Sequence, residues 1–198
     1  SFILNAQNNN GKFRNFLSYH RKWLDEEGSE DCFGRCIWAI CYALSGEHTP
    51  QGLKQGLMHI LNKAMPHAAS LKSPRAKAYT IIGLTRLEDE HAGRLSYELA
   101  RSLCSQYLTC RDGEWKWFED VVTYCNSILP WSLILAYRAA GEQRFLDIAV
   151  ESLGFLEGIT FRHGYFKPVG CNGWLLKGGE PAEYDEQAIE ACEMVLTY

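Results

Sequence analysis

Residues 126–157 read NSILPWSLILAYRAAGEQRFLDIAVESLGFLE, and this stretch decides the fold. The part from Ile128 to Tyr137 is apolar on nearly every face of a helix, and Gly141 is expected to end that helix. The part from Gln143 to Glu157 has one polar face. A helix packed on all sides, followed at once by a helix packed on one side, predicts an antiparallel hairpin with an inner and an outer helix.

The same alternation of helix types extends through the rest of the chain. Helices that are apolar on nearly every face are expected to begin near residues 31, 74, 126 and 185, so the hairpin recurs every roughly 45 to 60 residues. This repeat predicts an all-α fold of antiparallel helical hairpins forming a partial α/α toroid, with residues 1–198 as a single domain. A closed ring of six hairpins needs roughly 300 residues at this repeat, so we expect a fragment of a larger ring. The expected helices cover residues 31–44, 50–69, 73–90, 91–108, 126–140, 143–157 and 182–198.

The composition and charge exclude several classes of partner. The chain has 198 residues, 46% of them hydrophobic, with 20 basic against 24 acidic side chains and a net charge of −4. This slightly acidic balance argues against nucleic acid and anionic membranes as partners. No apolar run approaches the roughly 20 residues that a membrane-spanning helix needs, so we expect a soluble protein.

The eight cysteines lie mostly in apolar helical stretches, where a small hydrophobic residue would serve equally well. There is no C-x-x-C motif and no histidine pair at zinc-binding spacing. We therefore expect buried, reduced thiols, a reducing cytoplasmic location, and no metal or cofactor. Cys32 and Cys36 lie one helical turn apart and offer at most a two-residue metal site.

Two connections are long, and both precede an inner helix. They cover residues 110–125 and 160–183, whereas the links from inner to outer helices are short. Both long loops are expected at the same end of the helices, and loops longer than about 12 residues in a compact domain usually carry function. The first loop contains EWKWFED at residues 114–120. Because a flat indole packs on the apolar face of a sugar ring while carboxylates bind its hydroxyls, this mixture predicts a carbohydrate site.

Three pairs of adjacent acids stand at the starts of inner helices, and we expect them to converge at one rim of the ring. Paired carboxylates in an aromatic-lined cleft are the groups that glycoside hydrolysis uses. The alternative is that these acids only complement helix dipoles, while Trp115 and Trp117 plug the end of the ring. The candidate catalytic acids are Glu30, Asp31, Glu119, Asp120, Asp185 and Glu186, and the candidate substrate-binding residues are Trp115, Trp117, Tyr124, Asn126, Trp174, Arg35, Arg75 and Gln187.

A set of short motifs occurs in a fixed order from about residue 13 to the end. They are FLSY at residues 16–19, RKWL at 21–24, GSED at 28–31, Gly34-Arg35 with Trp38-Ala39, WFED at 117–120, Y-x-N at 124–126 with Leu129-Pro130, and YDEQ at 184–187 with Glu190-Ala191. Together they resemble the α/α-toroid region of bacterial glycosyltransferase-associated proteins, which is similar to six-hairpin glycosidases and sugar 2-epimerases. The resemblance implies a site at the inner-helix rim and a glycosyltransferase partner domain, and it assigns no catalytic residue. Cys32 and His20 depart from it, because a small polar residue and an acid are expected at these positions.

These features predict a carbohydrate-active domain that binds or hydrolyses a glycan at the inner-helix rim. One alternative is a non-catalytic module for sugar recognition or protein interaction. A third function is a sugar epimerase, which would use histidines as acid and base, and His20 and His163 are the residues placed to serve.

Overall fold

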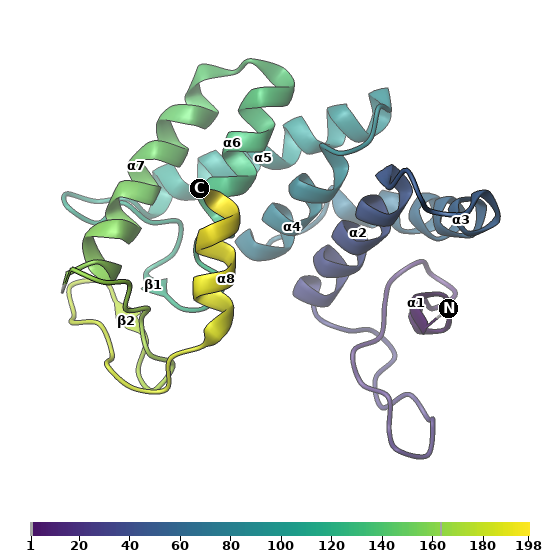
Figure 1. Ribbon diagram of the computed structural model, residues 1–198, viewed down its shortest axis with the longest axis horizontal. Helices are drawn as coiled ribbons and strands as arrows, with labels where there is room; N and C mark the ends of the chain where they lie inside the picture. Colours follow the sequence, from purple (N-terminus) through teal and green to yellow (C-terminus); the bar gives the residue numbers. More distant parts are fainter. Residues whose placement is uncertain (1, 163) are drawn as a thin grey trace. The chain divides into compact units, whose positions relative to one another are not determined.

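The computed structural model describes residues 2–162 and 164–198, and these residues are mostly helical (Figure 1). This confirms the all-α prediction. Contacts divide the chain into two compact units, residues 1–99 and 100–198, and the division falls inside helix α5 (Glu90–Cys110). Within the described ranges, every helix is too short or too polar to serve as a membrane span.

The first unit is built around helix α2 (Glu30–Ser45), which packs against both α3 (Gln51–Ala68) and α4 (Pro74–Leu84). Two glycines allow α2 and α4 to approach closely. A Cβ atom at Gly34 would lie 2.7 Å from the carbonyl oxygen of Ala76, and one at Gly83 would lie 2.9 Å from the Cα atom of Trp38. The two helices therefore meet backbone to backbone, which any larger residue at these glycines would prevent.

Helix α4 is buried along its whole length, as predicted for an inner helix. Its start is also as predicted, because Ser73 accepts a hydrogen bond from the amide of Ala76 and Pro74 follows at the first helical position. Its end is not. The helix stops at Leu84, six residues before the predicted end, and the Asp89 side chain instead accepts the amide of Ala92 to begin α5.

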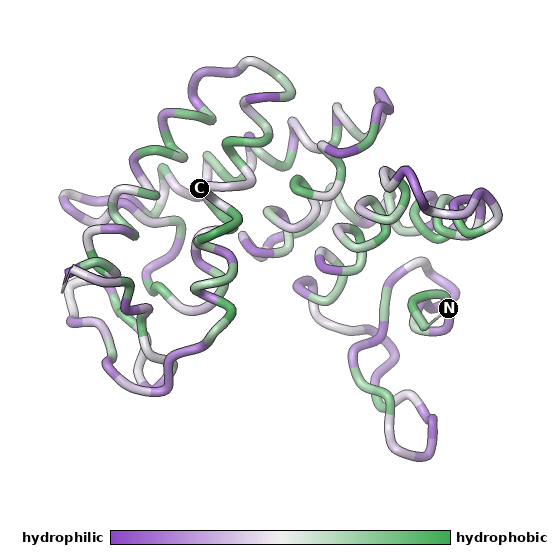
Figure 2. Tube along the Cα trace, in the orientation of Figure 1, coloured by the Kyte–Doolittle hydropathy of each residue, from purple (hydrophilic) through white to green (hydrophobic). Residues whose placement is uncertain are grey.

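The second unit is built around helix α6 (Ile128–Ala140), which packs against α7 (Gln143–Thr160) and α8 (Ala188–Thr197). Gly141 ends α6 in the left-handed conformation with φ 72°, which confirms the predicted hairpin turn. Hydrophilic and hydrophobic residues alternate along α7, as expected of an outer helix (Figure 2). Helix α8 begins six residues later than predicted, because Asp185 has φ 63° and no helix continues through that backbone.

Two short strands join the two long loops of the second unit. Strand β1 (Val121–Val122) pairs antiparallel with β2 (Leu175–Leu176), with Val121 opposite Leu176. The amide of Lys177 continues the pairing by donating to the carbonyl of Asp120 at 2.9 Å. The predicted proximity of the two loops is confirmed, and the strands that produce it were not predicted.

The segment before α2 contains one short helix, α1 (Phe2–Ala6), and two isolated bridges between extended residues. It is anchored by Phe13, whose buried ring packs 5.7 Å from that of Phe33 on α2. The hydrophobic pattern predicted no element in this segment. All eight cysteines lie among the described residues outside any disulfide; Cys41, Cys104 and Cys125 are buried, Cys192 is exposed and the other four are half-buried.

Candidate functional site

An open groove of about 500 Å³ lies in the second unit, where the two long loops meet α7. Apolar and charged side chains both line it, and we call it the long-loop groove. The apolar lining residues are Trp115, Phe155, Ile159, Leu175 and Pro181, and the charged ones are Asp112, Glu114, Arg162, Lys177 and Glu180.

A tight turn in the first long loop places Trp115 in the groove. Asp112 and Trp115 exchange both backbone hydrogen bonds, at 3.0 and 2.8 Å, around Gly113 with φ 50°. The indole nitrogen of Trp115 then donates to the carbonyl of Glu119 at 2.8 Å, and its ring meets Phe155 edge to face at 5.1 Å. Only 8% of Trp115 is exposed, so it offers the groove part of its ring and not an open platform.

Lys177 of the second long loop contacts three groups of the first long loop and the end of α5. Its ammonium lies 3.8 Å from a carboxylate oxygen of Asp112 and 3.8 Å from one of Asp120, and it donates to the carbonyl of Cys110 at 3.0 Å. The lysine belongs to the second long loop and its three partners to helix α5 or the first long loop. One side chain therefore links the two long loops beside the groove.

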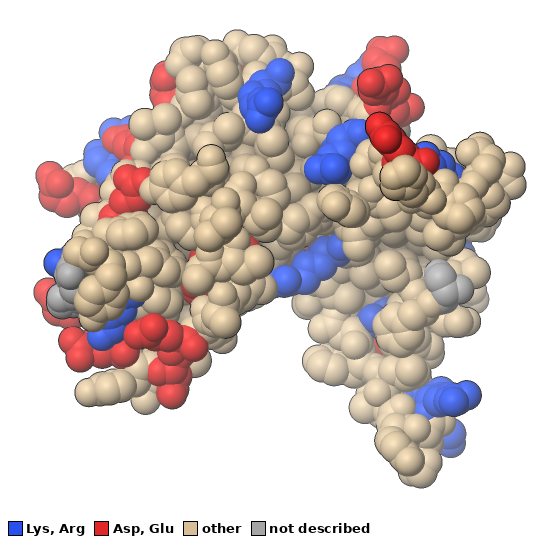
Figure 3. Space-filling model, in the orientation of Figure 1, with Lys and Arg blue, Asp and Glu red and all other residues tan. Residues whose placement is uncertain are grey.

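The predicted acids of the second unit lie on its surface. Asp120 is 79% exposed next to Lys177, and Glu119 is half-buried beside it. Asp185 and Glu186 are exposed in the segment that leads into α8, where acidic side chains gather (Figure 3). Asp185 has a local backbone role, because its carbonyl accepts the amide of Cys171 at 3.1 Å.

The predicted acids of the first unit connect two helix starts. The Glu30 carboxylate accepts the amides of Lys72 and Ser73, at 2.8 and 2.6 Å, and Asp31 accepts the hydroxyl of Ser73 at 2.8 Å. Glu30 and Asp31 of α2 thus bind the residues just before α4. This is the structural role named above as the alternative to a catalytic one for such acid pairs. Convergence of the three acid pairs at one rim stays a prediction.

The predicted aromatic platforms differ in accessibility. Trp117 is fully buried, with its ring against Phe118 at 5.5 Å and Phe155 at 5.9 Å. It is therefore a core residue in this structure, with no ring surface exposed to a ligand. Trp174 and Tyr124 are half-buried, with ring centres 6.3 Å apart.

The remaining predicted binding residues are distributed over both units. In the first unit the guanidinium of Arg35 lies 4.4 Å from the ring centre of Tyr79, and Arg75 is buried in the first turn of α4. In the second unit Gln187 is exposed just before α8. His20 is exposed beside Tyr19, and His163 lies outside the described residues.

Asn126 is buried, and its amide is engaged inside the protein. It donates to the carbonyl of Thr123 and to a carboxylate oxygen of Glu190, both at 2.8 Å. Glu190 also accepts the backbone amides of Cys125 and Asn126. The predicted substrate ligand Asn126 thus helps to anchor α8 to the segment before α6.

Two carboxylates on α8 that were not predicted as site residues are buried. Glu190 and Glu193 are 6% and 3% exposed, and with the Cys125 thiol they place three metal-binding types of atom within 4.8 Å of one another. Among the described residues this group is the one with a spacing that suits a metal ion. The available signal was two acids three residues apart in the otherwise apolar stretch AIEACEMVL.

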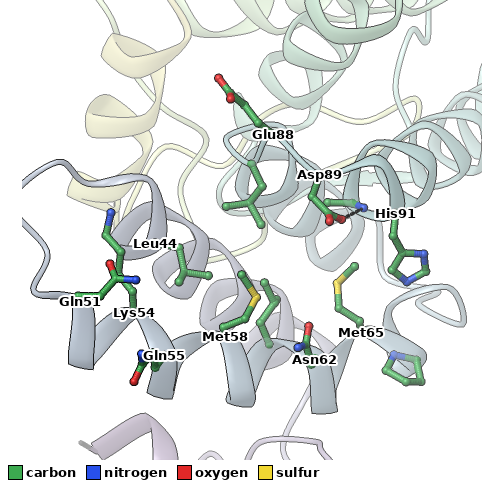
Figure 4. Close-up of a pocket in the computed structure, with 14 residues that line it drawn as sticks. Leu44, Gln51, Lys54, Gln55, Met58, Asn62, Met65, Glu88, Asp89 and His91 are labelled. Carbon is green, nitrogen blue, oxygen red and sulfur yellow. Dashed lines mark hydrogen bonds between the residues drawn. The ribbon is translucent and has the colours of Figure 1, made fainter.

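A second cavity, of about 850 Å³, lies in the first unit between α3 and the turn before α5. Figure 4 shows Met58 and Met65 of α3 pointing toward the turn that carries Glu88 and Asp89. No predicted site residue lines this cavity. Its methionine-rich floor suits apolar groups of varied shape.

Comparisons of the chain with protein-family models, curated proteins and solved structures gave no match.

Proposed function

We propose that this protein is a carbohydrate-active domain that binds a glycan in the long-loop groove. The observation that carries the proposal is the composition of the groove lining, in which the aromatic rings of Trp115 and Phe155 lie among charged side chains. Sugar rings present apolar C–H faces and a periphery of hydroxyls, so they require this combination of surfaces. The volume of about 500 Å³ falls within the range of small-molecule sites.

Binding is better supported than hydrolysis in this groove. A general acid for glycoside cleavage needs a carboxyl group shielded by apolar surroundings. The groove carboxylates of Asp112 and Glu180 are 80% and 91% exposed, and Asp120 beside them is 79% exposed. These acids are suited to accepting hydrogen bonds from sugar hydroxyls.

The proposed scaffold is a partial α/α toroid from a larger ring. In each unit the helices predicted as inner pack on one another, α2 on α4 and α6 on α8, and each of α2 and α6 also packs on the helix that follows it. This is the neighbour pattern of stacked hairpins with inner and outer helices. The motif resemblance supports a bacterial, cytoplasmic glycosyltransferase as the partner domain.

A glycan array combined with a hydrolysis assay tests the function. The proposal expects retention of α- or β-linked gluco-, manno- or galacto-oligosaccharides without release of reducing sugar. Turnover that disappears in the Glu119→Gln, Asp120→Asn double variant would instead identify a hydrolase. Interconversion of free sugar epimers would identify an epimerase, and failure to retain any glycan would contradict the proposal and favour a protein-interaction module.

A further inference from the structure

Residues 15–25 form a hairpin in the segment before α2, which we call the N-terminal hairpin (Figure 1). The amide of Leu24 donates to the carbonyl of Phe16 at 2.9 Å. At the base of the hairpin, the Asp25 carboxylate accepts the amides of Asn15 and Phe16, at 2.6 and 3.0 Å. These hydrogen bonds join the two arms and hold the hairpin in one conformation.

The two faces of the N-terminal hairpin differ in accessibility. Leu17 and Trp23 lie opposite each other on one face, where the ring of Trp23 packs 5.8 Å from that of Phe2 in α1. Because side chains alternate between the faces, Phe16 and Leu24 lie together on the other face. They are 61% and 71% exposed, so this face presents an apolar pair to solvent. Exposed apolar patches of this kind mark interaction sites.

The tip of the N-terminal hairpin is aromatic and basic. Tyr19 is 97% exposed there, and Arg21 and Lys22 are exposed beside it. Residues 15–24 contain no acidic side chain, in a chain whose net charge is −4. Figure 3 shows Lys and Arg side chains gathered at this end of the segment. The surface that complements the hairpin is therefore apolar and carries acids.

The cavity of about 850 Å³ in the first unit has this complementary character. Its lining includes Met58 and Met65 of α3, and Met58 is 44% exposed. Methionine side chains adapt to aromatic and branched groups. Glu88 and Asp89 line the cavity from the turn before α5, whereas the lining lysine, Lys54, belongs to α3 (Figure 4). These charges direct a basic ligand toward the turn.

We propose that the N-terminal hairpin of one copy of this chain docks in the cavity between α3 and the turn before α5 of a second copy. The apolar pair enters the cavity, and the basic tip lies against the acids of the turn. Each copy contributes a different surface, so the contact is heterologous and can add further copies. One hairpin covers a small area, so the association is weak and depends on concentration. Hairpin and cavity both belong to the first unit, so the inference is independent of glycan binding in the second.

Sedimentation velocity of the full chain over a wide range of concentrations tests the inference. We expect the average mass of the wild type to rise with concentration above that of the monomer. The hairpin variant, Phe16→Ser with Leu24→Ser, should weaken association by about tenfold or more, and so should Met58→Lys in the cavity. Leu53→Lys is the matched control for Met58→Lys, because Leu53 is 45% exposed on the same helix and is not among the lining residues. It should associate as the wild type does.

A mixture of the hairpin variant and Met58→Lys separates direct docking from a general loss of structure. The first keeps an intact cavity and the second an intact hairpin, so together they should form a one-to-one dimer that grows no further. Circular dichroism reports whether each variant is folded. A mixture of folded variants that stays monomeric would overturn the inference.

Two other results would also overturn it. One is a wild type that is monomeric at every concentration, and the other is self-association that the hairpin variant leaves unchanged. If the monomeric wild type sediments with vesicles of phosphatidylcholine and phosphatidylserine while the hairpin variant does not, the hairpin binds a lipid surface instead of a second copy.

Discussion

The side-chain amide of Asn126 donates a 2.8 Å hydrogen bond to the buried carboxylate of Glu190, 64 residues later in the chain. Two backbone amides, those of Cys125 and Asn126, donate to the same carboxylate. Cys125 has φ 50°, so this backbone does not continue the helix that follows it. Glu190 therefore stabilises the end of the first long loop and attaches α8 to it.

Replacing Glu190 should destabilise the fold strongly. Glu190→Gln replaces one acceptor oxygen by an amide that faces donors, so we expect a loss of about 2–4 kcal/mol in the free energy of unfolding. Urea denaturation measures it. Glu186→Gln is the matched control, because Glu186 is exposed just before the same helix α8. Its effect on the free energy of unfolding should stay within about 0.5 kcal/mol. Equal, small effects of both changes would show that the buried carboxylate contributes little.

The close approach of α2 and α4 makes Gly34 sensitive to a single added methyl group. Gly34→Ala places a Cβ atom 2.7 Å from the carbonyl oxygen of Ala76, and we expect a destabilisation of about 1–3 kcal/mol. Gly56 in α3 has no atom within 4 Å of a Cβ position, so Gly56→Ala should stabilise by about 0.5–1 kcal/mol. Thermal unfolding of the two variants should shift in opposite directions, and a shift in the same direction would contradict the packing argument.

Glu151 should make stability in the second unit depend on acid pH. The hydroxyl of Tyr107 donates to it at 2.7 Å, and Lys116 and Arg111 lie 3.2 and 3.3 Å away. The Tyr107 hydrogen bond, followed by these cations, holds the pKa of the Glu151 carboxyl below its ordinary value of 4.5, against the effect of burial. A lowered folded-state pKa stabilises the fold above the ordinary value, and that stabilisation is lost as the pH falls through the folded pKa.

The pH dependence is measured by urea denaturation of the wild type and of Glu151→Gln at pH 6 and at successive values below 4.5. The variant should be less stable at pH 6, and the difference should shrink as the pH falls. Asp147→Asn, an exposed change on the same helix, should follow the wild type at every pH. A Glu151→Gln deficit that is constant with pH would assign the effect to packing and not to charge.

The sequence predicted the parts of the fold that depend on periodic hydrophobicity and on capping residues. The apolar run 128–137 identified α6, Gly141 marked its end, and Ser73-Pro74 marked the start of α4. The pattern did not show where α4 ends, because Asp89 caps the next helix from within an apparently continuous stretch. Two-residue strands such as β1 and β2 carry no period, so pattern analysis could not have found them.

The candidate site was only partly predictable for a similar reason. The aromatic and acidic composition of residues 114–120 pointed to a loop whose Trp115 lines a groove. Composition could not show that Trp117 turns into the core. The burial of Glu190, which the motif resemblance names, was not predicted, because an acid in a helix is usually exposed and this one depends on donors 64 residues earlier.

The most direct test of glycan binding in the long-loop groove is a calorimetric titration with an array-selected oligosaccharide. The Asp112→Asn, Lys177→Gln double variant changes the groove walls at a largely exposed acid and its lysine partner, so the fold should survive. Glu88→Gln is the matched control, because it changes the cavity of the first unit instead. We predict that the double variant weakens binding at least tenfold, a change of about 1.4 kcal/mol, while Glu88→Gln binds as the wild type does. Unchanged affinity in the folded double variant, or loss of binding in Glu88→Gln alone, would contradict the account.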